Sequence, residues 1–68
     1  MKPIIDFERG GYGFSDYENV YGNGVEVYEI DGSGVPHLVT EVSGKSVDDI
    51  EDMTENEFVY FLNENGVL

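Results

Sequence analysis

Few side chains in this sequence could carry out catalysis. The chain has no cysteine and one histidine, so a cysteine nucleophile is excluded and a Ser-His-Asp arrangement would have to use His37. No nucleophile-elbow motif accompanies His37, and a predicted hairpin places it opposite Tyr28 as an ordinary cross-strand pair. Carboxylates are so frequent that a pair of them does not identify a general acid or base. The residue types therefore predict a protein that is not an enzyme, with no catalytic residue and no cofactor.

The acidic run DDIEDMTENE, residues 48–57, offers the carboxylate oxygens that bind hard cations such as Ca²⁺ or Mg²⁺. It lacks the Asp-x-Asp-x-Asp-Gly spacing of an EF-hand loop, and its acids fall within predicted helix. One histidine and no cysteine leave soft metals without ligands. We expect no dedicated metal site, with a divalent-cation-binding protein as an alternative.

The net charge of the chain indicates which kind of partner it could bind. Fifteen acidic residues face three basic ones, Lys2, Arg9 and Lys45, which gives a net charge of −12. Nucleic-acid binding needs clusters of Lys and Arg that release counterions, and binding to an anionic membrane needs the same positive charge. Self-repulsion at this charge density also destabilises a compact state. The charge therefore favours a basic protein as partner, with solubility alone as the other explanation.

The spacing of the acids is similar to that of phosphates. Side chains three or four residues apart on a helix are ~5–6 Å apart, and alternate residues on a strand are ~6.6 Å apart. We estimate roughly 6–7 Å between successive phosphates of a nucleic-acid strand. We therefore expect a ridge or stripe of acids that fits a DNA-binding groove. The predicted partner-binding residues are the acids Asp48, Asp49, Glu51, Asp52, Glu55, Glu26 and Glu41, with Tyr28, Tyr12 and Phe14 as apolar anchors. Tyr60 is a further tyrosine outside the predicted core.

The chain of 68 residues has the length of one small domain, residues 1–68. Hydrophobic residues make up 40% of it, which is too apolar for a disordered acidic tail. Without cysteines, the fold depends on packing rather than on disulfides. The sequence shows neither a signal peptide nor an apolar segment of ~18 residues. We expect a cytoplasmic protein, in the host cytoplasm if a phage encodes it, and the oligomeric state stays open.

A glycine-rich and aromatic segment, GGYGFSDYENVYGNG, occupies residues 10–24. The spacing of Ser15 and Glu18 matches a capping box, and the tyrosines and valine that follow recur at helical spacing. This pattern predicts a short helix over residues 15–22, ended by a glycine. The glycine-hinged tip before it carries Tyr12 and Phe14, which either face a partner or cap the sheet.

Two runs of β-forming residues surround this segment. Residues 3–8 read as a strand, and residues 24–42 read as a hairpin around Asp-Gly-Ser-Gly. The predicted register sets Val27 opposite Leu38 on the face that packs into the core. The other face of the hairpin forms an apolar strip framed by acids. Pro36 lacks an amide hydrogen, which favours an edge position for its strand.

Residues 46–66 read as helical, in two parts. Ser46 is a predicted N-cap, and a second start follows at once, where Thr54 and Glu57 form a capping box. The buried stripe of the second part consists of Phe58, Phe61 and Leu62. The order of elements predicts an α+β fold, with a small antiparallel sheet (the N-terminal strand plus the β-hairpin) and the C-terminal helices packed on one face.

In size, charge and α+β pattern, the chain resembles small acidic inhibitors that phages make against host DNA-acting enzymes, such as uracil-DNA glycosylase inhibitors and some anti-CRISPR proteins. The resemblance extends over the whole chain but transfers no site residue. It implies a non-enzymatic DNA mimic that blocks the basic nucleic-acid-binding site of a nuclease, glycosylase or CRISPR effector, without itself binding nucleic acid or membrane. The alternative is a small adaptor or assembly domain that binds a protein through its sheet face or an edge strand.

Overall fold

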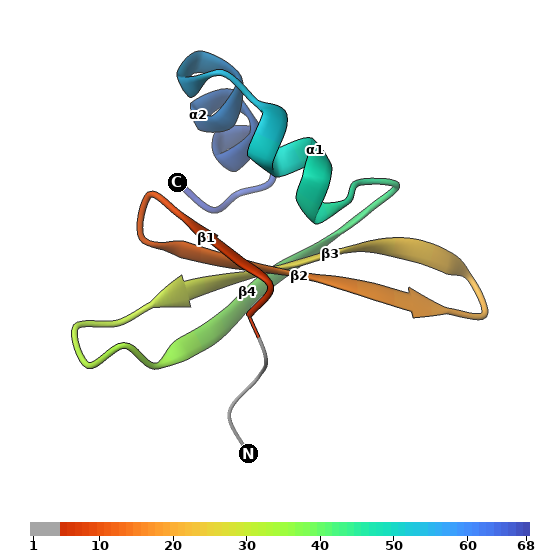
Figure 1. The fold of residues 1–68 in the computed structure, drawn as a ribbon, viewed down its shortest axis with the longest axis horizontal. Coiled ribbons are helices and arrows are strands. Elements are labelled where there is room, and N and C mark those ends of the chain that lie inside the picture. Colours follow the sequence, from red (N-terminus) through yellow and green to blue (C-terminus); the bar gives the residue numbers. More distant parts are fainter. Residues whose placement is uncertain (1–4) are drawn as a thin grey trace.

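The computed structural model describes residues 5–68 and contains one antiparallel sheet covered on one face by two helices (Figure 1). The strands are ordered β1-β2-β3-β4 in the sheet, so every neighbour in space is also a neighbour in sequence. This arrangement confirms the predicted α+β fold with C-terminal helices on one face of the sheet. The elements are β1 (Phe7–Arg9), β2 (Tyr12–Asn19), β3 (Gly22–Ile30), β4 (Pro36–Ser43), α1 (Val47–Asp52) and α2 (Glu55–Glu64).

The predicted helix over residues 15–22 is wrong, because this segment forms most of β2 and the turn into β3. All eight residues of β2 pair with β3, from Tyr12 opposite Glu29 to Asn19 opposite Gly22. At the turn, the Asn19 side-chain oxygen accepts a hydrogen bond of 2.8 Å from the Tyr21 N–H, and Tyr21 is 95% exposed. A one- to two-turn helix is unstable alone, so the long ladder with β3 determines the structure.

The predicted register of the β3–β4 hairpin is also wrong. Leu38 pairs with Tyr28 rather than with Val27, and a bulge follows between Val27 and Tyr28. The cause is a longer loop, residues 31–35, in which the Asp31 carboxylate accepts hydrogen bonds of 2.8 and 2.9 Å from backbone N–H groups. The shift removes Leu38 from the core, and its side chain is 54% exposed. The edge position that Pro36 favours is confirmed, since β4 is the last strand of the sheet.

The hydrophobic core lies between the sheet and the helices. Phe14 of β2 is fully buried, and its ring meets the Phe58 ring of α2 edge-on at 5.9 Å between centroids. The predicted stripe of α2 is confirmed as the helix's contribution to this core. The buried cluster consists of Phe14, Val25, Val27, Val47, Ile50, Phe58, Phe61 and Leu62.

Both predicted helix starts are confirmed, and α1 has a capping box at Ser46 in addition to the one predicted at Thr54. The Ser46 hydroxyl accepts a hydrogen bond from the Asp49 N–H, and the Asp49 carboxylate accepts one from the Ser46 N–H. Thr54 and Glu57 make the same reciprocal pair at the start of α2. These contacts satisfy N–H groups that a helix start would otherwise leave unpaired. They therefore fix both helices in a chain too small for a large core.

Candidate functional site

The C-terminal helical region, on one side of the sheet, carries more than half of the net negative charge of the chain (Figure 1). Residues 46–68 contain seven acids and no Lys or Arg (−7), whereas residues 1–45 contain eight acids and three bases (−5). All seven helical acids are exposed. We call this set the acidic helix surface: Asp48, Asp49, Glu51 and Asp52 of α1 with Glu55, Glu57 and Glu64 of α2.

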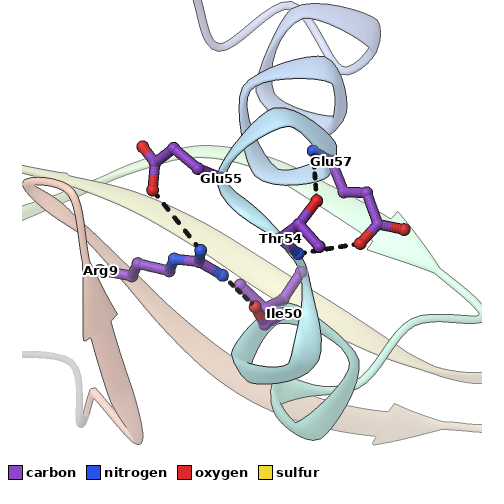
Figure 2. Close-up of polar contacts among 5 residues, drawn as sticks. All are labelled: Arg9, Ile50, Thr54, Glu55 and Glu57. Atoms are coloured by element: carbon purple, nitrogen blue, oxygen red, sulfur yellow. Dashed lines mark hydrogen bonds and ion pairs between the residues drawn. The ribbon is translucent and has the colours of Figure 1, made fainter.

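Local hydrogen bonds hold two of these carboxylates in place. The Asp49 carboxylate is held by the Ser46 N–H at 2.9 Å and the Glu57 carboxylate by the Thr54 N–H at 2.8 Å (Figure 2 shows the second pair). Hydrogen bonds from the Thr54 backbone and hydroxyl keep the pKa of Glu57 below its usual value of 4.5. The capping boxes therefore order acids that also form part of the exposed charge.

Asp16 of β2 adds a further acid beside the start of α1. Its carboxylate accepts a hydrogen bond of 2.9 Å from the Val47 N–H, although the two residues are 31 positions apart in the chain. The Asp6 carboxylate in turn accepts the Asp16 N–H at 3.1 Å. Asp16 therefore connects the sheet to the first turn of α1 and sets where the acids of that helix lie.

Arg9 of β1 ties the two helices to the sheet (Figure 2). Its guanidinium donates a hydrogen bond of 2.8 Å to the Ile50 carbonyl, lies 3.7 Å from the Glu55 carboxylate and sits 4.5 Å from the centre of the Phe58 ring. Among residues 5–68, this is the one ion pair between a Lys or Arg and a carboxylate. Arg9 thus stabilises the helix layer and pairs with Glu55, whereas no Lys or Arg among residues 5–68 pairs with another acid of the surface.

A groove runs along the side of α2 that carries Glu57, Tyr60 and Glu64. The groove has a volume of about 490 Å³, and a smaller hollow of about 230 Å³ adjoins it. Lys45, Met53 and Glu57 line both. Tyr60 is 66% exposed in its wall, and the Glu64 carboxylate accepts its hydroxyl hydrogen bond and raises the pKa of Tyr60. The groove is lined by Lys45, Met53, Asn56, Glu57, Tyr60, Phe61, Glu64 and Asn65.

The structure brings some of the predicted partner-binding residues together and separates others. The five helical acids of the prediction all lie in the helix layer and are exposed, although Glu55 faces Arg9 of the sheet: Asp48, Asp49, Glu51, Asp52 and Glu55. Glu26 instead lies between the buried Val25 and Val27, so its side chain points to the opposite face of the sheet. Glu41 is directly opposite Glu26 in the ladder and therefore shares that face.

Two of the three predicted aromatic anchors are buried. Phe14 belongs to the core and is inaccessible to a partner, which corrects its assignment as an anchor. Tyr28 is only 7% exposed on the open sheet face; burial and the adjacent Glu26 carboxylate raise its pKa. Tyr12 is half-buried and packs against the core. The alternative that Tyr12 and Phe14 cover the sheet is therefore the one that the structure supports.

The sequence analysis missed the groove and the role of Arg9. The groove has a local signal, because Met53, Glu57, Tyr60 and Glu64 recur at spacings of three and four residues along the helical region. Arg9 has no such signal, since its hydrogen-bond partner Ile50 lies 41 residues away in the chain.

His37 does not face Tyr28, as the predicted register required, but pairs with Glu29 in the ladder. Its Nε2 lies 2.9 Å from the Asp31 carboxylate. The contact with His37, together with two backbone N–H groups, lowers the pKa of Asp31 to about 2. These contacts order the β3–β4 loop at the end of the sheet.

Residues 5–68 hold no group of three or more His, Cys, Asp or Glu side chains arranged to bind a metal ion. No helix among them has the length and apolar character to cross a membrane.

The chain has been compared with models of protein families, with curated proteins and with solved structures. None of the three comparisons finds a match.

Proposed function

We propose that this protein is a non-enzymatic DNA mimic that blocks the basic nucleic-acid-binding site of a DNA-acting protein of the nuclease, glycosylase or CRISPR effector type. The observation that supports the proposal is the acidic helix surface, with seven exposed carboxylates on a segment, residues 46–68, that contains no Lys or Arg. An excess of this kind costs folding stability through self-repulsion, so its retention on one layer favours a role in binding.

The arrangement of the helices suits this role physically. Buried Ile50 and Phe58 anchor α1 and α2 to the sheet, and the capping boxes order Asp49 and Glu57. Fixed charges need little reorganisation when a partner binds. A surface of this charge would be steered toward a basic groove and would release the counterions that accompany both surfaces. We propose that it acts in the cytoplasm, where a DNA-acting enzyme of the host would be found.

A competition experiment tests the proposal with a matched pair of triple variants. One variant neutralises the helices (Asp48→Asn, Glu51→Gln, Asp52→Asn), which leaves the capping acids intact. The other makes the same charge change on exposed strand positions (Glu8→Gln, Glu18→Gln, Glu29→Gln). Each protein competes with labelled duplex DNA for a panel that includes a uracil-DNA glycosylase and a CRISPR effector nuclease.

We expect the wild type and the strand variant to displace DNA from at least one member of the panel, and the helix variant to lose most of this activity. Equal losses in the two variants would mean that net charge alone is responsible. Failure of the wild type to displace DNA from any basic protein would remove the proposal.

A second candidate, an adaptor that binds through the sheet, is favoured by the edge strand β4. Leu38 and Val39 are 54% and 39% exposed there, beside the like-charged pair Glu26 and Glu41, which is unfavourable in the free protein. The double variant Leu38→Ser, Val39→Thr would abolish binding by an adaptor and leave a DNA mimic active. Substitution of Tyr28 is unsuitable for this test because Tyr28 is buried.

A further inference from the structure

We propose that the groove along α2 binds an arginine side chain of the basic partner. The inference rests on the proposed function and specifies how the same surface would recognise its target. It names one occupant, an arginine, and it predicts that the groove prefers arginine to lysine, which charge alone does not explain.

The walls of the groove combine an apolar surface with carboxylates. Met53, Tyr60 and Phe61 supply the apolar part, and Glu57 and Glu64 supply negative charge. Glu57 precedes Tyr60 by three residues and Glu64 follows it by four, so both carboxylates are neighbours of the Tyr60 ring on the helix surface. An arginine matches this pattern because its aliphatic stem packs on apolar surface while its planar guanidinium binds carboxylates and stacks on aromatic rings.

The inner side of α2 already holds an arginine in this way. The Arg9 guanidinium lies 4.5 Å from the centre of the Phe58 ring and 3.7 Å from the Glu55 carboxylate, which precedes Phe58 by three residues. Tyr60 is two residues beyond Phe58 and therefore points to nearly the opposite side of the helix. There Glu57 and Tyr60 repeat the spacing of Glu55 and Phe58. Arg9 is the only arginine of the chain, so a guanidinium on the outer side would have to come from a partner.

The position of Glu64 supports a cationic occupant. Glu64 is the last residue of α2, and this helix has no basic residue in its final turn. A carboxylate at the C-terminal end of a helix is unfavourable because the end of the helix carries partial negative charge. A bound guanidinium would relieve this repulsion. Lys45 is the one cation in the walls of the groove, and its compact, strongly hydrated ammonium does not supply the planar contacts of a guanidinium.

Fluorescence anisotropy with two labelled peptides, nona-arginine and nona-lysine, tests the inference. The peptides have equal charge, so their affinity ratio isolates the contribution of the guanidinium. The variants are Tyr60→Ala, Tyr60→Leu (which keeps apolar surface but removes the ring) and Glu64→Gln. Val59→Ala is the matched control, because Val59 is 41% exposed on the same helix and does not line the groove. Circular dichroism verifies that each variant is folded.

We expect the wild type to prefer nona-arginine, and each Tyr60 variant to reduce this preference roughly two- to fivefold, the effect of one exposed cation–π contact. Glu64→Gln should also reduce it, whereas Val59→Ala should leave it unchanged. A preference that survives both Tyr60 variants would overturn the arginine groove. Equal, salt-sensitive binding of both peptides would overturn it as well, while leaving the DNA-mimic proposal standing. If neither peptide bound the wild type at low salt, both proposals would fail.

Discussion

The two sides of α2 carry the same residue types in different surroundings. On the inner side, Phe58 is buried and Glu55 contacts Arg9, so charge and aromatic surface hold the helix to the sheet. On the outer side, Tyr60 is mostly exposed and Glu57 and Glu64 line an open groove. Composition alone therefore does not distinguish a helix side that packs on the sheet from one that lines an open groove. The difference is that the chain supplies a guanidinium on the inner side, where Arg9 contacts Glu55, whereas the cation in the walls of the groove is Lys45.

The largest expected difference between the two sides concerns their aromatic residues. Phe58→Ala should lower the free energy of unfolding by roughly 3–5 kcal/mol because it leaves a cavity beside Phe14. Tyr60→Ala should change it by no more than about 0.5 kcal/mol, since the side chain is exposed. Urea denaturation followed by circular dichroism measures both values. Similar losses for the two variants would show that the outer side also belongs to the core.

Arg9 and Lys45, the two cations next to the helices, should also differ in how much they contribute to the free energy of unfolding. Arg9→Met should lower the free energy of unfolding by about 1.5–3 kcal/mol, because the partly buried Ile50 carbonyl loses a charged hydrogen-bond donor. Lys45→Met should change it by no more than about 0.5 kcal/mol, since Lys45 is exposed. Urea denaturation again gives the comparison. A stable Arg9→Met protein would contradict the role assigned to Arg9.

A smaller loss of stability is expected at the start of α2. Thr54→Ala removes the hydroxyl that accepts the Glu57 N–H at 3.2 Å, and loss of such a cap costs about 1 kcal/mol. Thr54→Ser keeps the hydroxyl and should retain most of the stability. Thermal denaturation of the two variants measures the difference, and equal melting temperatures would argue against the cap.

The smallest expected effect is the pH dependence of the stability that Glu57 contributes. Its pKa is lower in the folded protein than its usual value of 4.5, because the ionised carboxylate accepts hydrogen bonds from Thr54. A lowered folded pKa contributes stability that is complete above the unfolded pKa and is lost as pH falls through the folded one. The melting-temperature difference between the wild type and Glu57→Ala should therefore be largest above about pH 4.5 and shrink below it. A difference that stays constant with pH would exclude this linkage.

The sequence was sufficient to predict the helices, because their signals are local. The caps at Ser46 and Thr54 and the stripe at Phe58, Phe61 and Leu62 all lie within a few residues of the structure they determine. The clustering of the helical acids follows from the same locality. These parts of the fold and of the site could therefore be predicted without knowing how the strands pair.

The strands were harder to predict because their structure depends on distant partners. The spacing of Ser15 and Glu18 matches a helix start, yet Ser15 pairs with Glu26 in the sheet. The β3–β4 register depends on a five-residue loop and on a bulge after Val27, and neither follows from alternation of apolar residues. The same non-local pairing buried Phe14 and placed Glu26 and Glu41 away from the other acids.

The salt dependence of target binding tests whether the helical carboxylates carry the interaction with a basic partner. For a basic protein that the wild type inhibits, the dissociation constant is measured from low to high salt for the wild type and for the helix and strand triple variants. We expect weaker binding as salt rises, with a clearly shallower salt dependence for the helix variant and a nearly unchanged one for the strand variant. A wild-type dissociation constant that stays flat with salt, or two variants with the same slope, would contradict it.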